Sequence, residues 1–277
     1  MTARHSPATP EELYLDLLKK CLTRYLFADG RRSTSDRIQR RISRGVSPWL
    51  GRIGHGLPQS IHVDPDQRAD GRDWPADAET MVGLHRLDNL ESCIVDVLRR
   101  NVPGDLIETG IWRGGAAIFM RGVLKAYGDE ERVVWAADSF DGLPRPDAQT
   151  YPADRGNKYW RSKFLAVSLD EVRSNFERYG LLDDRVRFLR GWFRDTLPSA
   201  PIEQLSVLRL DGDLYESTMV ALRALYPKLS IGGYVIVDDW GAFPGCRAAV
   251  EEFRAEHGIG DELHSMDWSG SFWRRSA

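Results

Sequence analysis

Four aspartates in two short clusters are the residues whose types and spacing are best suited to chemistry. Asp211 and Asp213 follow one short apolar run, and Asp238 and Asp239 follow another at residues 233–237. Such runs are typical of buried strands in a parallel sheet, and ligands bind these sheets outside the carboxyl ends of the strands. Four carboxylates in one crevice repel each other unless a hard divalent cation holds them, and oxygen-only ligands suit Mg, Ca or Mn. The pattern therefore predicts a metal site.

The same carboxylates suit the activation of an alcohol hydroxyl. A divalent ion bound to the hydroxyl oxygen stabilises the developing alkoxide, and a nearby carboxylate removes the proton. We assign Asp211, Asp238 and Asp239 to the metal and Asp213 to the base, and we leave the division of roles within the set open. In the competing interpretation these acids are helix caps and surface turn residues, but buried carboxylates without partners are costly.

The elements that must position these residues begin at about residue 81, where the pattern changes to alternating strands and helices. This alternation predicts a parallel α/β sheet. The tail differs, because residues 264–267 and 271–274 flank a Trp-Ser-Gly turn and predict an antiparallel hairpin. The expected fold is the Rossmann-like sheet of class I methyltransferases, mostly parallel with this hairpin at its end. The expected strands are residues 105–109, 132–138, 185–191, 205–211 and 233–239, and the expected helices are residues 114–127, 167–180, 215–229 and 244–257.

The first 80 residues have a different character. Residues 11–27 carry apolar side chains at helical spacing and predict an amphipathic helix. Residues 31–44 are rich in arginine, which is typical of a solvated loop or of a basic arm near an anionic ligand. Residues 45–80 predict a long connection. We therefore divide the chain into an N-terminal helical arm at residues 1–80, serving as a lid or dimer segment, and a catalytic domain at residues 81–277.

A glycine-rich turn follows the first strand of the predicted domain. The pattern from Glu108 to Gly115 is ExGxxxGG, which lacks the spacing of a dinucleotide loop. The acid before the first glycine would oppose a diphosphate but favours a cationic ligand such as the sulfonium and ammonium groups of S-adenosylmethionine. Candidate cofactor residues here are Glu108, Thr109, Gly110 and Arg113, although Arg113 alternatively pairs with a surface acid.

Further candidate cofactor residues follow other strands. Asp138 ends the second strand, where an acid is positioned to accept hydrogen bonds from ribose hydroxyls, or alternatively caps a turn. Trp192 offers an aromatic face to adenine or packs in the core, and Met81 borders the cofactor or fills the core. The remaining members of the cofactor set are Ser139, Phe140, Gly191, Phe193 and Asp211.

Composition excludes several classes of protein. The formal net charge is −3, so nothing in the bulk composition suggests a nucleic-acid or anionic-membrane partner. Three widely spaced cysteines without a CxxC pattern predict neither disulfides nor a zinc site, and they fit a reducing cytoplasm. The N-terminus lacks the apolar stretch of a signal peptide, and no apolar run approaches the roughly 20 residues of a membrane span. We expect a cytoplasmic protein.

Taken together, these motifs resemble the macrocin O-methyltransferase family, which includes relatives acting on mycinamicin and novobiocin sugars. The resemblance covers most of the chain and thins at residues 28–75 and 144–166. It implies Mg²⁺-dependent methylation of a sugar hydroxyl of a glycosylated natural product, in antibiotic biosynthesis, with S-adenosylmethionine as donor. It also implies a homodimer or higher homo-oligomer. The motifs are Glu108-Thr109-Gly110, Ala137-Asp138-Ser139-Phe140, Gly191-Trp192-Phe193, Leu210-Asp211-Gly212-Asp213 and residues 232–239.

Other interpretations stay open. A catechol-type enzyme that methylates a phenolic hydroxyl would use the same carboxylates, whereas a binding protein without turnover would have little use for them. A hydride-transfer enzyme is disfavoured by the glycine spacing. Residues 151–163 are polar and aromatic, and we expect a lid that orders over the substrate rather than a disordered loop. His85, His257 and His264 stand singly and are expected to be structural or exposed.

Overall fold

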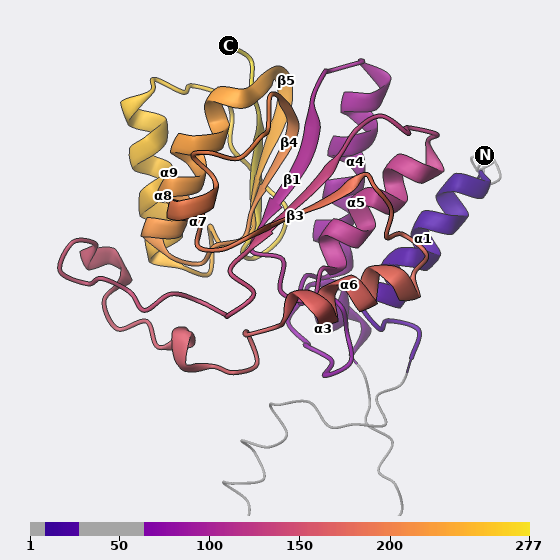
Figure 1. Cartoon of the computed structure of the whole chain (residues 1–277), viewed down its shortest axis with the longest axis horizontal. Helices are drawn as coiled ribbons and strands as arrows, with labels where there is room; N and C mark the ends of the chain where they lie inside the picture. The colour runs from indigo at the N-terminus through magenta and orange to yellow at the C-terminus, as the bar shows by residue number, and fades with distance from the viewer. Residues whose placement is uncertain (1–8, 28–63) are drawn as a thin grey trace, which may run out of the picture.

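The computed structural model describes residues 9–27 and 64–277, and a seven-stranded sheet lies at its centre (Figure 1). The strand order is β3-β2-β1-β4-β5-β7-β6. The first five strands in this order are parallel, and the β7 and β6 pairings are antiparallel. The strands are β1 (Asp105–Thr109), β2 (Val134–Asp138), β3 (Val186–Arg190), β4 (Leu205–Leu210), β5 (Leu229–Val237), β6 (His264–Ser265) and β7 (Ser271–Arg274).

Helices cover both faces of this sheet. In Figure 1, α7, α8 and α9 lie on one face and α1, α4, α5 and α6 on the other. Short α3 and the 3-10 turns η2, η3 and η4 lie in the connections. The bounds are α1 (Pro10–Leu22), α3 (Pro65–Ala69), α4 (Leu84–Arg99), α5 (Gly115–Ala126), η2 (Pro152–Asp154), η3 (Tyr159–Arg161), α6 (Leu169–Arg178), α7 (Phe193–Thr196), α8 (Tyr215–Leu225), η4 (Tyr226–Lys228) and α9 (Pro244–Glu256).

The central strands are apolar on both sides because both faces are covered. In β1, Leu106 packs into the core beneath α4 and α5, whereas the next residue, Ile107, packs into the core beneath α8 and α9. All six residues of β4 are buried. This near-continuous apolar character is what a parallel sheet between two helical layers requires. The two cores fix the sheet, and its carboxyl edge is left open for a site.

Helix α1 belongs to the first of these cores. A capping box begins it, with Thr9 and Glu12 each accepting a hydrogen bond from the other's backbone amide. Leu15, Leu18 and Leu22 are buried in the core that α4 and α5 also form. The N-terminal helix therefore packs directly on the domain, whereas the predicted domain division at residue 80 stays a prediction.

The expected strand set and the terminal hairpin are confirmed, but several boundaries differ. Strand β5 begins at Leu229, four residues before the predicted start, and continues through Gly232, whose φ of 88° bends the chain at a register shift. Helix α8 ends at Leu225 instead of residue 229 because Pro227 cannot continue it. The helix predicted at residues 11–27 ends at Leu22, and Arg24 then turns with a φ of 58°.

Two helices between residues 64 and 99 were not expected from the sequence. The sequence analysis did not identify α4, whose buried face includes Arg86 as well as apolar residues. The end of the predicted connection at residues 45–80 contains α3, and the basic segment at residues 31–44 lies outside the described residues. Within the described ranges, the helices are all too short or too polar to cross a membrane.

Candidate active site

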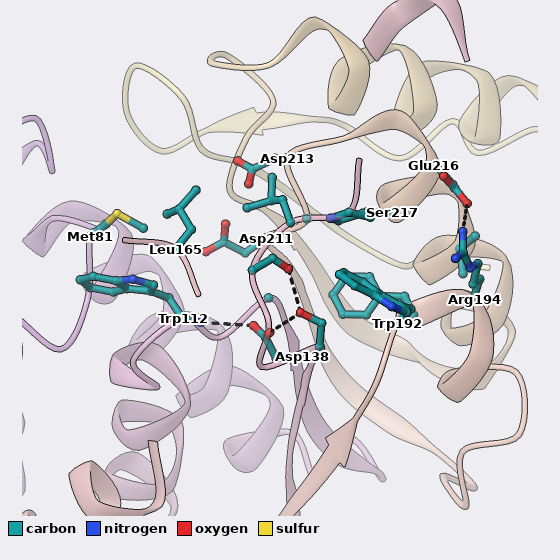
Figure 2. Close-up of a pocket in the computed structure, with 18 residues that line it drawn as sticks. Met81, Trp112, Asp138, Leu165, Trp192, Arg194, Asp211, Asp213, Glu216 and Ser217 are labelled. Atoms are coloured by element: carbon teal, nitrogen blue, oxygen red, sulfur yellow. Dashed lines mark hydrogen bonds and ion pairs between the residues drawn. The ribbon is translucent and has the colours of Figure 1, made fainter. Parts of the chain in front are cut away.

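A crevice at the carboxyl edge of the sheet brings together most of the predicted site residues (Figure 2). It consists of a smaller cavity of about 110 Å³ and a larger cavity of about 610 Å³. Figure 2 shows the smaller cavity, with Trp112 at one end, Trp192 at the other, and Asp138 and Asp211 between them. The two cavities adjoin, because both are lined by Met81, Gly110, Trp112, Leu165, Asp211 and Asp213.

Three of the four aspartates form a group that fits a metal ion. Asp211, Asp238 and Asp239 each offer a carboxylate oxygen, and these oxygens lie within 4.8 Å of one another. They converge because β4 and β5 are parallel neighbours, with Leu210 opposite Val237, so that both strands end at the same edge. Three hard oxygen donors are a suitable set for Mg²⁺, which completes its shell with water or substrate. The residues present therefore fit the expected ion.

Asp213 lies beside this group with an unusual backbone. Its φ is 56°, in the left-handed region that non-glycine residues seldom adopt. Its amide donates a hydrogen bond to Oδ2 of Asp239, at 3.0 Å. Asp213 lines both cavities, whereas Asp239 lines only the larger one. The backbone of the predicted base is thus tied directly to a predicted metal ligand.

Three of the carboxylates, those of Asp211, Asp213 and Asp239, have raised pKa values. Burial, followed by the charges of neighbouring carboxylates, raises the pKa of Asp211 to about 6 and the pKa of Asp213 to about 8. Burial and the same neighbours raise the pKa of Asp239 well above its usual range. A bound divalent ion would lower these pKa values, because it stabilises the charged form.

A buried arginine accompanies the carboxylates and was missed in the sequence analysis. Arg209, on β4, pairs with Glu108, with Asp238 and, at 2.9 Å, with Asp211. Burial alone would lower the pKa of Arg209, but these three carboxylates raise it, so the guanidinium stays charged. The expectation that only a cation would hold the acids together is therefore wrong. A charged residue inside an apolar strand, two positions before Asp211, was the signal that could have revealed it.

A second arginine extends this network to other elements. Arg86 of α4 pairs with Asp238 and, at 2.7 Å, with Asp267 in the turn between β6 and β7. Asp238 is therefore held on one oxygen by Arg209 and on the other by Arg86. These contacts fix the orientation of a predicted metal ligand before any metal binds.

The glycine turn after β1 brings the backbone close to the same acids. Gly110 has a φ of 84°, and a Cβ at this position would overlap the carbonyl oxygen of Asp211. No residue except glycine fits this contact. Glu108, just before the turn, is buried, and among the described residues its Oε2 has no hydrogen-bond partner. Burial raises its pKa to about 8 against the opposing effect of Arg209. Oε2 of Glu108 is therefore available to a cationic ligand.

Asp138 caps turns, as one of its two expected roles required, and its role in binding ribose stays a prediction. Its Oδ2 accepts the amide of Ile111 at 2.9 Å, and its Oδ1 accepts the amide of Phe140 at 2.7 Å. It therefore caps two turns, and it also lines the smaller cavity with Ser139. Trp192 and Phe193 line the same cavity and are only partly buried.

Four of the predicted cofactor residues do not line either cavity: Thr109, Arg113, Phe140 and Gly191. The Arg113 guanidinium instead donates to the carbonyl oxygens of Ala76 and Ala78, at 2.6 and 3.0 Å, and lies 3.6 Å from Glu171. It thus fastens the segment before α4 to the start of α5. The alternative expectation, that Arg113 pairs with a surface acid, agrees with its contact to Glu171. Its two backbone partners were not predictable, because they are remote in the chain.

The segment predicted to be a lid forms a wall of the larger cavity. Residues 151–163 contain η2 and η3, and Asp154, Asn157 and Tyr159 line the cavity. Tyr159 packs edge-on against Phe243, with ring centroids 5.6 Å apart. The segment is therefore placed against the start of α9, and its movement as a lid stays a prediction.

The comparisons with known proteins agree with this geometry. Residues 11–275 match the family model described as Macrocin-O-methyltransferase (TylF). The chain is 51% identical over 267 residues to the 8-demethyl-8-(2,3-dimethoxy-alpha-L-rhamnosyl)-tetracenomycin-C 4'-O-methyltransferase of Streptomyces olivaceus, covering 96% of this chain and 94% of that one. It is 56% identical over 210 residues to the demethyldecarbamoylnovobiocin O-methyltransferase of Streptomyces niveus, covering 76% and 80%.

A solved structure, that of the O-methyltransferase NovP, resembles this one with a TM-score of 0.83 at 47% sequence identity. The match covers 96% of this chain and 100% of that chain. Together with the strand order and the terminal hairpin, it establishes the class I methyltransferase fold. The chain therefore belongs to the macrocin-O-methyltransferase family and is an S-adenosylmethionine-dependent O-methyltransferase.

Proposed function

We propose that this enzyme methylates a sugar hydroxyl of a glycosylated natural product in antibiotic biosynthesis, and that it requires Mg²⁺. The observation that carries the proposal is the group formed by Asp211, Asp238 and Asp239, whose oxygens lie within 4.8 Å of one another beside two adjoining cavities. The relatives add the substrate class, since one acts on a rhamnosyl tetracenomycin and another on a novobiocin precursor.

The smaller cavity is proposed to hold S-adenosylmethionine. Trp192 lies at its far end and would offer an aromatic face to adenine, and Asp138, which also lines the cavity, would accept hydrogen bonds from ribose hydroxyls. Glu108 lines the larger cavity, two residues before Gly110, which lines both, and its Oε2 is proposed to bind the cofactor ammonium group. The sulfonium would then lie near Asp211 and Asp213, which border both cavities.

In the proposed reaction, Asp213 accepts the proton of the acceptor hydroxyl as its oxygen attacks the methyl carbon. The new C–O bond forms while the C–S bond breaks, and the electron pair of that bond stays on sulfur as a neutral thioether. Burial and the neighbouring carboxylates raise the pKa of Asp213, so its charged form is a stronger base than an exposed carboxylate. Asp211, Asp238 and Asp239 would hold Mg²⁺, which would supply positive charge to stabilise the developing alkoxide.

The first experiment measures cofactor and metal binding by isothermal titration calorimetry, followed by mass spectrometry of products from a panel of glycosides and catechols. We expect S-adenosylhomocysteine to bind at micromolar concentration, and EDTA to abolish methyl transfer to a glycoside. Asp213→Asn is expected to lower kcat by about 10²- to 10⁴-fold, the usual contribution of a general base, while cofactor affinity is kept.

Each arm has an outcome that contradicts the proposal. Full activity in EDTA would contradict the requirement for Mg²⁺, and full activity of Asp213→Asn would contradict the assignment of Asp213 as the base. Methylation of catechols with no reaction on glycosides would favour the phenolic alternative. Asp147→Asn is the matched control, because Asp147 is exposed and its hydrogen bonds stay within its own turn.

We also propose that the enzyme forms a homodimer. The outer side of α1 exposes Leu13 and Leu17, whose exposed fractions are 60% and 53%, together with Tyr14. An apolar helix face of this kind is typical of a contact surface. Light scattering coupled to size exclusion is expected to give about twice the chain mass of 31.5 kDa, and a value equal to the chain mass would overturn this part of the proposal.

A further inference from the structure

Asp154 is a buried carboxylate whose setting the proposed reaction does not explain. Its side chain is 3% exposed, and among the described residues it forms no ion pair. Its Oδ1 accepts the backbone amide of Tyr215 at 2.8 Å, whereas its Oδ2 has no hydrogen-bond partner within the described part of the chain. A buried carboxylate is costly unless the surroundings stabilise it, so these surroundings need an explanation.

Two helix N-termini supply that stabilisation. Helix α8 begins at Tyr215, and the residue at its cap position, Leu214, has no side chain able to cap it. Asp154 provides the cap from 61 residues away. Helix α9 begins at Pro244, and Gly245 lies so close that a Cβ there would overlap Oδ1 of Asp154. The positive ends of two helix dipoles thus converge on one carboxylate.

The capped end of α8 directly follows the proposed base. Asp213 holds a left-handed backbone with a φ of 56°, a conformation that persists only where the surroundings determine it. Three successive amides are fixed here. The amide of Asp213 donates to Asp239, that of Leu214 donates to Gly212 at 2.5 Å, and that of Tyr215 donates to Asp154. One side of the strained turn is therefore held by a proposed metal ligand and the other by Asp154.

Asp154 also fastens the wall of the larger cavity to the helices behind it. Tyr151, three residues earlier, stacks on Tyr215 with ring centroids 5.4 Å apart, and Tyr159 packs against Phe243 at the start of α9. Asp154 lies between Tyr151 and Tyr159 in the sequence and is the buried residue of η2. The same residue therefore belongs to the cavity wall and caps the helix that follows the proposed base.

We propose that Asp154 is a positioning residue that couples the cavity wall at residues 151–163 to the base Asp213 through the N-terminus of α8. The proposal rests on the proposed function for the role of Asp213. The structural coupling itself does not depend on which acceptor is methylated. It predicts that loss of the carboxylate loosens both the start of α8 and the wall, and that an uncharged side chain with the same acceptor oxygen restores them.

Hydrogen exchange measured by mass spectrometry tests the coupling in the full-length protein. Asp154→Ala is expected to raise exchange at residues 211–219 and to speed tryptic cleavage after Arg155 and Lys158, which are exposed. Asp154→Asn keeps an oxygen that can cap α8 and is expected to behave like the unsubstituted protein. Asp147→Ala, an exposed aspartate earlier in the same connection, is the matched control and is expected to leave both signals unchanged.

A second substitution, in α9, disturbs the same hydrogen bond. Gly245→Ala should favour α9 by itself, since alanine has the higher helix propensity, but its Cβ would overlap the Asp154 carboxylate and lie 3.0 Å from the Tyr215 amide nitrogen that Asp154 caps. We expect faster exchange at residues 211–219 without loss of the fold, monitored by circular dichroism. If Asp154→Ala and Gly245→Ala both fold and leave exchange and cleavage unchanged, the coupling is wrong.

Kinetics then separate this proposal from the proposed function. Once a glycoside acceptor is methylated, Asp154→Ala is expected to lower kcat by about 10- to 100-fold, as misplacement of a catalytic group does, with unchanged affinity for S-adenosylhomocysteine. Asp154→Asn is expected to recover most of the loss. Altered exchange with no methylation of any glycoside would contradict the proposed function alone, whereas unaltered exchange with normal methylation would contradict the coupling alone.

Discussion

At the scale of single residues, the site is defined by carboxylates that are held close together before a metal binds. Arg209 contacts Glu108, Asp211 and Asp238, and Arg86 contacts Asp238 and Asp267. Removing one partner of a buried ion pair is usually costly, because it leaves a charge without compensation. The arginines therefore explain how Glu108, Asp211 and Asp238 remain together in the folded chain, and the raised pKa values of Asp213 and Asp239 show that burial disfavours their charged forms.

The raised pKa values predict how pH affects the metal-free protein. The folded pKa of Asp213 is about 8, above the value of about 3.9 for an unfolded chain, so the folded state holds this proton more tightly. The stability that this proton contributes is present in acid and is lost as pH rises through about 8. We expect the melting temperature without metal to fall from pH 6 to pH 8, measured by scanning calorimetry.

The affinity for Mg²⁺ should rise with pH, because Mg²⁺ competes with protons at Asp211 and Asp239. The apparent Kd for Mg²⁺ is expected to fall between pH 6 and pH 8, and calorimetric titration in buffers of different ionisation enthalpy should detect released protons. The variant Asp213→Asn should reduce the pH dependence of the melting temperature. Metal binding that is independent of pH would contradict this account of the site.

At the scale of elements, the turn between β1 and α5 determines whether the crevice exists. Gly110 and Gly114 both have positive φ, and Gly110 lies against the carbonyl oxygen of Asp211 at the end of β4. The turn therefore joins the cofactor side of the crevice to the metal side by direct backbone contact. A side chain at this position would separate two elements that the site requires together.

Substitution of two glycines with similar backbone angles tests this contact. Gly128→Ala meets no atom within 4 Å and has a φ of 73°, so only backbone strain of about 1–2 kcal/mol is expected. Gly110→Ala has a φ of 84° and an overlap as well, so it should destabilise the protein further and abolish binding of S-adenosylhomocysteine. Calorimetry measures both effects, and equal effects of the two substitutions would show that the close approach is unimportant.

At the scale of the whole molecule, helix α1 is part of the core that supports the sheet. Leu15 is fully buried there, whereas Leu17, two residues later on the same helix, is 53% exposed. The N-terminal helix is therefore held by one face only, and the opposite face is available for the proposed dimer contact. The stability of the domain should depend on the first face and not on the second.

Alanine substitution of these two leucines tests that distinction. Leu15→Ala removes buried side-chain volume and is expected to lower the free energy of unfolding by about 2–5 kcal/mol, measured by denaturant titration. Leu17→Ala should change the free energy of unfolding by less than about 0.5 kcal/mol at protein concentrations where the chain is monomeric. A large loss at Leu17 in the monomer would mean that the exposed face is packed in solution.

Sequence patterns alone were sufficient to predict the strands along the chain and the edge where the four aspartates meet. Alternating apolar runs specify strands, and parallel strands necessarily bring their carboxyl ends to one edge, so Asp211 and Asp238 could be placed together without coordinates. The terminal hairpin followed from its turn residues. Helix α4 was missed because its buried face carries Arg86 among apolar side chains, which obscures the pattern.

The contacts between side chains of different elements could not be predicted before the chain was seen folded. Arg209 reaches Glu108 because β1 and β4 are neighbours with Glu108 opposite Arg209, and Arg113 turns to backbone oxygens of residues 76 and 78. Asp154 caps a helix that begins 61 residues later. Such contacts depend on strand register and on the path of long connections, which local sequence patterns do not specify, so the charge balance of the site emerged only when the chain was folded.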